Sequence, residues 1–223
     1  TPKHFLEPYL VIGKAAELAD ELHDGQIRHR PNDDGTTREY ICHTLEVAFI
    51  AAHYEVALRK KHEENLPDDY VVQAIVDAVD ASATMDKHDL KHALMDIASR
   101  LDVEQLRQCV GLICHDVVEK NYKRNLRPGE VLTPEVKQRI AAPILQQVAH
   151  IANKGQKARE QSRLADSSEV YAKLKSIDAI ANTNDQASIP LEERPLEDMC
   201  RKLDAMGNVV ALGLKRPERH HLR

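Results

Sequence analysis

The chain contains no tryptophan, and among its 223 residues glycine occurs only 8 times and proline 10 times. Runs of β-branched residues are few, so the composition favours helices over strands. No lysine- and arginine-rich stripe is present, which argues against duplex nucleic acid and anionic membranes as partners. No apolar run approaches the roughly 20 residues that span a bilayer. These absences indicate a soluble globular protein.

The cysteines and the N-terminal segment indicate a cytoplasmic location. Cys42, Cys109, Cys114 and Cys200 show no C-x-x-C spacing, so we expect them to be reduced, partly buried and without a chemical role. The first residues, Thr1 to His4, lack the apolar core of a secretory signal. The net charge of −5 and the 42% of hydrophobic residues fit a domain with a sizeable core.

Apolar residues recur at helical spacing along nearly the whole chain, and no long segment alternates with period two. The pattern predicts an all-α fold of about eight helices and no sheet. The helical segments are expected at residues 11–22, 41–52, 72–79, 90–101, 106–117, 136–151, 170–181 and 196–210.

Several residues mark the ends of these segments. Thr133 and Asp166 are suited to helix N-caps, and Pro143 predicts a kink inside its helix. Residues 29–39 and 121–132 contain turn-forming sequences and are expected to be loops. The acidic segment 63–100 carries no motif, and we expect a helical insertion or a lid there.

Polar residues that can bind a cation occur at three places. In a helix, His115 and Asp116 point about 100° apart and can reach one cation, with Glu119 on the same side. A surface pair is the simpler interpretation of these residues alone. The row Lys175, Asp178 and Asn182 follows one helix face, where a solvated surface is the simpler alternative. The third place is His43, in a strongly apolar helix, where a core histidine is the simpler alternative.

Together, two imidazoles and two carboxylates suit one divalent ion, since His43, His115, Asp116 and Asp178 offer mixed nitrogen and oxygen donors. Such a set favours Mn²⁺, Fe²⁺ or Zn²⁺ over Ca²⁺. An ion held in this way lowers the pKa of a bound water and polarises a phosphoryl oxygen. The pattern therefore indicates hydrolysis of a phosphate ester or anhydride.

The order of these residues resembles the H…HD…D pattern of the HD-domain metal-dependent phosphohydrolases, which are all-helical. The flanking residues resemble the RelA/SpoT-type alarmone hydrolases more closely. The segment His23-Asp24-Gly25-Gln26-Ile27-Arg28 is similar to their H-x-G-Q-x-R opening, and Tyr40-Ile41 with His43 and Val47-Ala48 to their Y-I-x-H-P-L-x-V-A helix. The segment from His115 to Glu119 is similar to H-D-V-V-E-D, and that from Lys175 to Asn182 to K-L-A-D-R-L-x-N.

The resemblance implies a Mn²⁺-dependent hydrolase that removes the 3′-pyrophosphate of a guanosine alarmone such as ppGpp. It implies a single HD-type helical bundle over residues 1–216, with the insertion at about 63–100, and a tail at 217–223. By this resemblance His43, His115, Asp116 and Asp178 hold the metal, and Glu119 positions or deprotonates the attacking water. Arg28, Lys175 and Asn182 contact the nucleotide, and Asn182 does so beside the metal.

Three departures from the family keep other functions open. Lys120 stands where the family has an acid, and it either weakens general-base catalysis or binds a phosphate. The segment between Arg28 and Tyr40 is longer than the family's short turn. His43 and His115 are 72 positions apart, more than the family normally allows. The alternatives are an HD phosphohydrolase for a deoxynucleotide or NADPH, and a degenerate domain that binds a nucleotide without turnover. A homo-oligomer also stays open.

Overall fold

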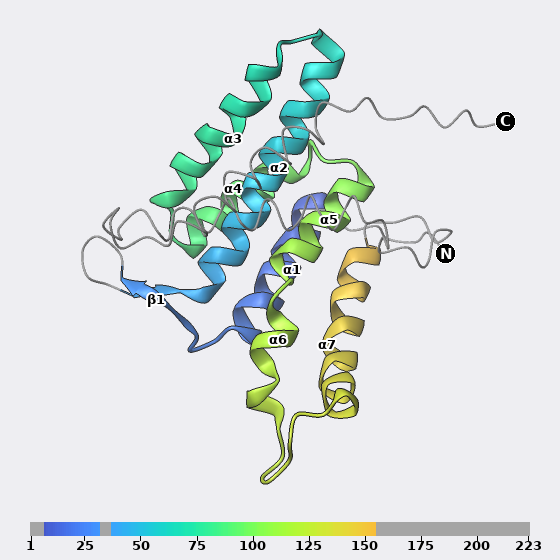
Figure 1. Cartoon of the computed structure of the whole chain (residues 1–223). Coiled ribbons are helices and arrows are strands. Elements are labelled where there is room, and N and C mark those ends of the chain that lie inside the picture. Colours follow the sequence, from blue (N-terminus) through green and yellow to red (C-terminus); the bar gives the residue numbers. More distant parts are fainter. Residues whose placement is uncertain (1–6, 32–36, 155–223) are drawn as a thin grey trace, which may run out of the picture.

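A computed structural model describes residues 7–31 and 37–154 of the chain. These residues form mostly helices, which confirms the all-α prediction (Figure 1). The elements are α1 (Pro8–Leu22), β1 (Ile27–Pro31), β2 (Thr37–Glu39), α2 (Tyr40–Glu64), α3 (Asp68–Ala83), α4 (Lys87–Ala98), α5 (Val103–Ile113), α6 (Val117–Asn121), the 3₁₀ turn η1 (Lys123–Asn125) and α7 (Pro134–Lys154). The two helices expected at 170–181 and 196–210 lie outside the described residues.

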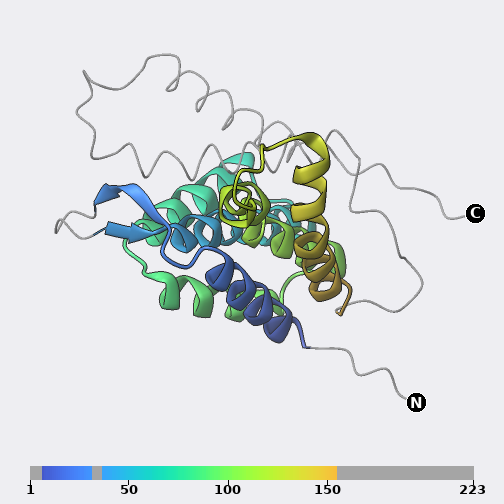
Figure 2. The ribbon, with the colours of Figure 1, turned by 90° about the horizontal axis from the view of Figure 1, so that it is seen from below.

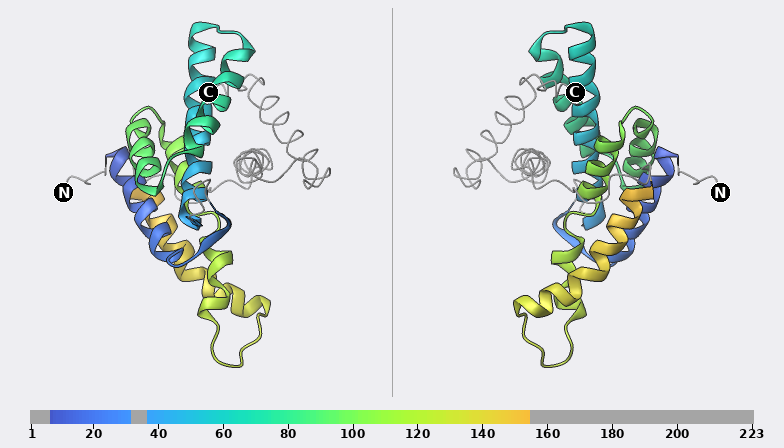
Figure 3. Two further views of the ribbon diagram at one scale, coloured as in Figure 1. Left: turned by 90° about the vertical axis from the view of Figure 1, so that its left-hand side faces the viewer. Right: turned by 90° about the vertical axis from the view of Figure 1, so that its right-hand side faces the viewer.

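The helix α2 forms the centre of the fold. Every residue from 41 to 52 is buried, so this part of α2 is enclosed on all sides, as expected for a helix without a solvent face. It packs against α3, α4 and α5, while α1 packs against α4 and α5 (Figures 1 and 3). By length and composition α2 could cross a membrane, but 78% of its most apolar window is buried inside the protein. Core helices pass the same test, so α2 gives only weak evidence for a membrane.

The acidic segment 63–100 contributes to this core. It forms the end of α2, then α3 and α4, and the side chains of Leu90 and Leu94 are fully buried. Asp86 caps α4, since its carboxylate accepts hydrogen bonds from the backbone of His88 and Asp89 at 2.8 and 2.9 Å. Residues 63–100 therefore pack into the helical core of the described part of the chain.

Two predictions about local structure were wrong. The expected loop at 29–39 contains part of a two-stranded antiparallel sheet, in which Ile27 lies opposite Glu39 and Pro31 opposite Thr37 with an irregular register (Figure 2). The backbone N–H of Tyr40 then donates to the carbonyl of Gln26, so the hairpin closes directly onto the start of α2. The second error concerns the segment 106–117, which is divided between α5 and α6.

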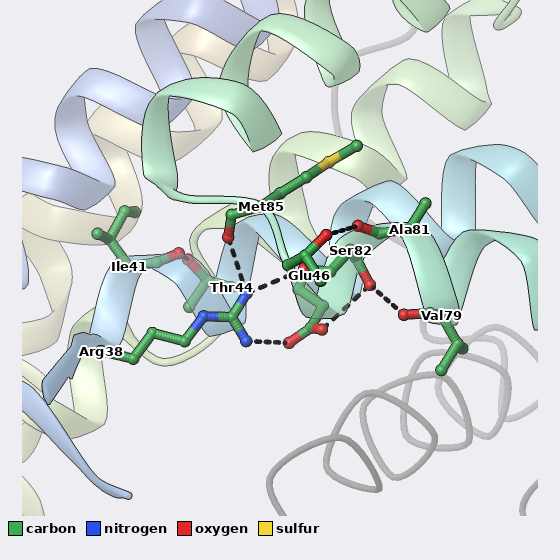
Figure 4. A network of polar contacts seen from close by, with 9 residues as sticks. Arg38, Ile41, Thr44, Glu46, Val79, Ala81, Ser82 and Met85 are labelled. Atoms are coloured by element: carbon green, nitrogen blue, oxygen red, sulfur yellow. Dashed lines mark hydrogen bonds and ion pairs between the residues drawn. The ribbon is translucent and has the colours of Figure 1, made fainter. Parts of the chain in front are cut away.

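A buried ion pair attaches this hairpin to the core (Figure 4). Arg38 in β2 contacts the fully buried Glu46 of α2 at 3.3 Å, and it also donates to the carbonyls of Ser82 and Met85. The Ser82 hydroxyl donates to the other Glu46 carboxylate oxygen at 3.1 Å. One guanidinium thus connects β2, α2 and the turn between α3 and α4.

We predict that Arg38→Met lowers the free energy of unfolding by about 3 kcal/mol, because it removes the guanidinium from beside the buried Glu46 carboxylate. Adding Glu46→Leu should recover part of this loss, since the buried carboxylate is then removed as well. Reversible chemical denaturation measures both effects. The control is Lys91→Met, which removes an exposed ion pair with Glu17 and should cost less than about 1 kcal/mol. An equal cost for Arg38→Met and Lys91→Met would contradict the structural role of Arg38.

Candidate metal centre

Three chain segments meet near the start of α2. The first turn of α2 supplies Tyr40 and His43, the turn between α5 and α6 supplies His115 and Asp116, and the end of α1 leads into His23 (Figure 1). Ligand atoms of His43, His115 and Asp116 all lie within 4.8 Å of one another. The structure therefore brings together three of the four predicted metal ligands.

The orientation of His115 follows from a bond to its own backbone. His115 Nδ1 lies 2.6 Å from the Leu112 carbonyl oxygen, which can only accept, so Nδ1 carries the proton. In a continuous helix this carbonyl would accept from the N–H of Asp116. Here it accepts instead from the backbone N–H of His115 at 3.3 Å as well as from the His115 ring, at the point where α5 ends. Nε2 is left as a lone-pair donor, the form in which histidine binds metals.

Asp116 is positioned by the adjacent helix. The hydroxyl of Tyr40 donates a hydrogen bond to Asp116 Oδ2. The same oxygen lies 3.5 Å from His115 Nε2. In the neutral imidazole with its proton on Nδ1, both of these atoms have lone pairs. Two facing lone pairs repel unless a proton or a cation lies between them. This pair of atoms is therefore suited to binding a cation.

His43 completes the described part of the cluster from the first turn of α2. Its side chain is only 2% exposed, and its ring centre is 5.8 Å from that of His115 and 5.9 Å from that of Tyr40. Both ring pairs meet edge to face, so the imidazole is held by packing. A buried, fixed imidazole loses little conformational entropy on binding an ion.

The size of the cluster fits one divalent ion. Nitrogen and oxygen ligands bond at about 2.1 Å, so two ligands of one ion are at most about 4.2 Å apart. The observed limit of 4.8 Å requires only small side-chain shifts to reach this value. Two imidazoles and a carboxylate suit Mn²⁺, Fe²⁺ or Zn²⁺. Cys114 is next to His115, but burial raises the pKa of its thiol to about 12, so it remains protonated and a poor ligand at neutral pH.

The other predicted site residues are placed only in part. Asp178, Asn182 and Lys175 lie outside the described residues. Arg28 belongs to β1 and Glu119 to α6, and the structure describes the backbone of both but not the side chains. Glu119 was placed beside His115 on the assumption of one continuous helix, and that assumption was wrong because α5 ends before His115.

Lys120 lies at a cleft next to the cluster. Its ammonium is 4.7 Å from the centre of the Tyr40 ring. The cleft has a volume of about 810 Å³, and its lining includes Tyr40, Lys120, Lys123 and Arg124. We call it the basic cleft. The ring of Tyr40 lines this cleft while its hydroxyl contacts Asp116, so the cleft and the cluster share this side chain.

Two residues at the site were given no role from the sequence. Tyr40 precedes His43 by three positions, a spacing that places both on one helix face and could have indicated its role. His23 is 2% exposed, its ring packs 4.9 Å from that of Tyr40, and its Nδ1 lies 2.9 Å from Gln26 Oε1. Burial lowers the pKa of His23, against the opposing effect of the Gln26 hydrogen bond. His23 therefore supports Tyr40 as a neutral side chain.

Comparisons with known proteins add nothing to this geometry. No protein-family model matches the chain, and no curated protein or solved structure matches it either. The family suggested by the sequence motifs therefore stays a prediction.

We predict that His115→Ala abolishes Mn²⁺ binding, since it removes one of the three clustered donors. Isothermal titration calorimetry with MnCl₂ measures the binding, and circular dichroism should show nearly unchanged helix content. The control is His53→Ala, which removes a half-buried imidazole of α2 at a position outside the cluster. Unchanged Mn²⁺ affinity in His115→Ala would exclude this residue as a ligand.

Tyr40→Phe should weaken Mn²⁺ binding by about 10- to 100-fold, because hydrogen bonds that orient a metal ligand contribute effects of this size. The phenyl ring preserves the packing against His23 and His43, so stability should change little. Tyr70→Phe is the matched control, since this tyrosine lies on α3. The role assigned to the Tyr40 hydroxyl would be wrong if both variants bound Mn²⁺ like the unmodified protein.

Proposed function

We propose that this chain is a metal-dependent pyrophosphohydrolase that removes the 3′-pyrophosphate of guanosine alarmones such as ppGpp. The observation that supports this proposal most is the cluster of His43, His115 and Asp116 beside the basic cleft. A phosphohydrolase needs a cation at the reacting phosphate and positive charge for the other phosphates. Both requirements have candidate residues here.

The reaction has simple chemical requirements. Water attacks the phosphorus attached to the ribose 3′ oxygen, a new P–O bond forms, and the bond to the 3′ oxygen breaks. The products are GDP and pyrophosphate, and the 3′ oxygen takes up a proton. A bound Mn²⁺, or Fe²⁺ or Zn²⁺ in its place, would polarise the phosphoryl oxygen and acidify a water molecule.

The remaining roles follow from the motif resemblance. Asp178 is proposed as the fourth ligand, and Glu119 as the group that accepts the proton of the attacking water. Asn182, Lys175 and Arg28 are proposed to contact the nucleotide, Arg28 by stacking or by forked hydrogen bonds. With a nucleotide as substrate, a cytoplasmic location is also proposed.

Lys120 supports a second candidate, a nucleotide-binding domain without turnover. Lys120 stands at the position where the RelA/SpoT-type hydrolases, which the motifs resemble, have an acid. Its ammonium can weaken general-base catalysis and still bind a phosphate. Its position over the Tyr40 ring, 4.7 Å from the ring centre, is compatible with both functions. Tight nucleotide binding without any hydrolysis would distinguish this candidate from the enzyme.

We predict that the purified protein with Mn²⁺ converts ppGpp to GDP and pyrophosphate, detected by ³¹P NMR and anion-exchange chromatography. Glu119→Gln should retain Mn²⁺ and slow the reaction by about 10²- to 10⁴-fold if it removes the general base. Glu64→Gln, an exposed position at the end of α2, is the control and should leave the rate unchanged.

The outcome with other substrates separates the alternatives. Release of inorganic phosphate from NADPH, or of triphosphate from a deoxynucleotide, with no turnover of ppGpp would assign a different substrate. Absence of hydrolysis with Mn²⁺, Fe²⁺ and Zn²⁺ would refute the enzymatic proposal.

A further inference from the structure

The basic cleft contains more positive charge than the candidate metal centre requires. Its lining includes Lys120 from α6, Lys123 and Arg124 from η1, and Asp24 and Gln26 from the connection between α1 and β1. The part of the lining that the structure describes thus contains three cations and a single carboxylate. This excess of positive charge favours an anionic ligand.

These three cations have no carboxylate partner among the described residues, unlike several other basic residues of the protein. Lys87 and Lys91 contact carboxylates of α1, and Arg107 and Arg139 contact Glu104 and Glu130. Within the described residues, by contrast, Lys120, Lys123 and Arg124 take part in no ion pair, and all three are exposed. Their charges are thus available to a ligand in the cleft.

Lys123 and Arg124 follow the candidate metal centre along the chain. Lys123 comes seven residues after Asp116, with α6 between them, and both cations belong to the 3₁₀ turn η1. Both also line the basic cleft, as Lys120 does. A phosphate group of the substrate other than the one beside Asp116 can therefore be their ligand.

We propose that Lys123 and Arg124, together with Lys120, form a second phosphate subsite that binds the phosphates of the substrate that are not hydrolysed. The inference rests on the proposed function and adds a specificity to it. The enzyme selects nucleotides that carry phosphates at both the 3′ and the 5′ position. For ppGpp the subsite holds the 5′-diphosphate, with Lys123 acting as a point charge and Arg124 as a forked donor.

Tyr40 links the candidate metal centre to the first cation of this subsite. Its hydroxyl contacts Asp116, and the ammonium of Lys120 lies 4.7 Å from the centre of its ring. The side chain belongs to the first turn of the buried helix α2, so it is held by the core. Lys120 and the candidate metal centre therefore contact the same side chain.

The test compares two nucleotides that differ only at the 5′ position, namely ppGpp and guanosine 3′-diphosphate. In the double variant K123Q/R124Q we expect KM for ppGpp to rise about tenfold or more, which corresponds to 1.4 kcal/mol per tenfold change. KM for guanosine 3′-diphosphate and the affinity for Mn²⁺ should not change. The matched control is K14Q/R127Q, which removes two exposed positive charges outside the cleft lining.

Calorimetric measurement of the affinity for both nucleotides distinguishes an incorrect subsite from an incorrect proposed function. One outcome is that neither nucleotide is hydrolysed, while K123Q/R124Q weakens the binding of ppGpp and leaves the binding of guanosine 3′-diphosphate unchanged. The subsite would then be present and the enzymatic activity absent. Equal ppGpp affinity in the variant and the unmodified protein would overturn the subsite even if ppGpp is hydrolysed. Equal weakening of both nucleotides would also overturn it, because the cations would then act on the 3′ end.

Discussion

The hydrogen bond between His115 Nδ1 and the Leu112 carbonyl orients one imidazole of the candidate site. It forms where α5 ends at Ile113, and the same carbonyl also accepts from the backbone N–H of His115 at 3.3 Å. The chain then turns, and α6 begins at Val117, with Lys120 at the basic cleft. With Nδ1 bound in this way, Nε2 of His115 lies 3.5 Å from Asp116 Oδ2. A bond at the end of α5 therefore orients a candidate metal ligand.

The buried helix α2 holds Tyr40 and His43 rigidly next to the turn between α5 and α6. His43 is 2% exposed and Glu46 fully buried, and Glu46 is bound by Arg38 and Ser82, so the first turns of α2 are held from several sides. Tyr40 extends from this helix to Asp116, and its ring also lines the cleft. Rigid placement matters because a metal site tolerates errors of only about 0.5 Å in the positions of its ligands.

Helical periodicity predicted the all-α fold and the segments that form α1 to α5 and α7, because their apolar residues face one core. It missed the break at Cys114, since Ile113 and Val117 continue the apolar stripe through it. It missed the hairpin, whose strands show no apolar alternation and which is attached by the contact of Arg38 with Glu46. The role of Tyr40 was also missed, because its contact with Asp116 joins residues 76 positions apart. The motifs identified His43, His115 and Asp116 as candidate ligands. Their proximity in space depends on the fold and is seen only in the structure.

The central claim is that His43, His115 and Asp116 hold one divalent ion. The most direct measurement is anomalous X-ray scattering at the manganese absorption edge from crystals grown with Mn²⁺. We predict a single strong peak about 2.1 Å from a nitrogen of each histidine and from an Asp116 carboxylate oxygen. A peak bound elsewhere, or no peak at this cluster in crystals that contain Mn²⁺ at saturating concentration, would contradict the account.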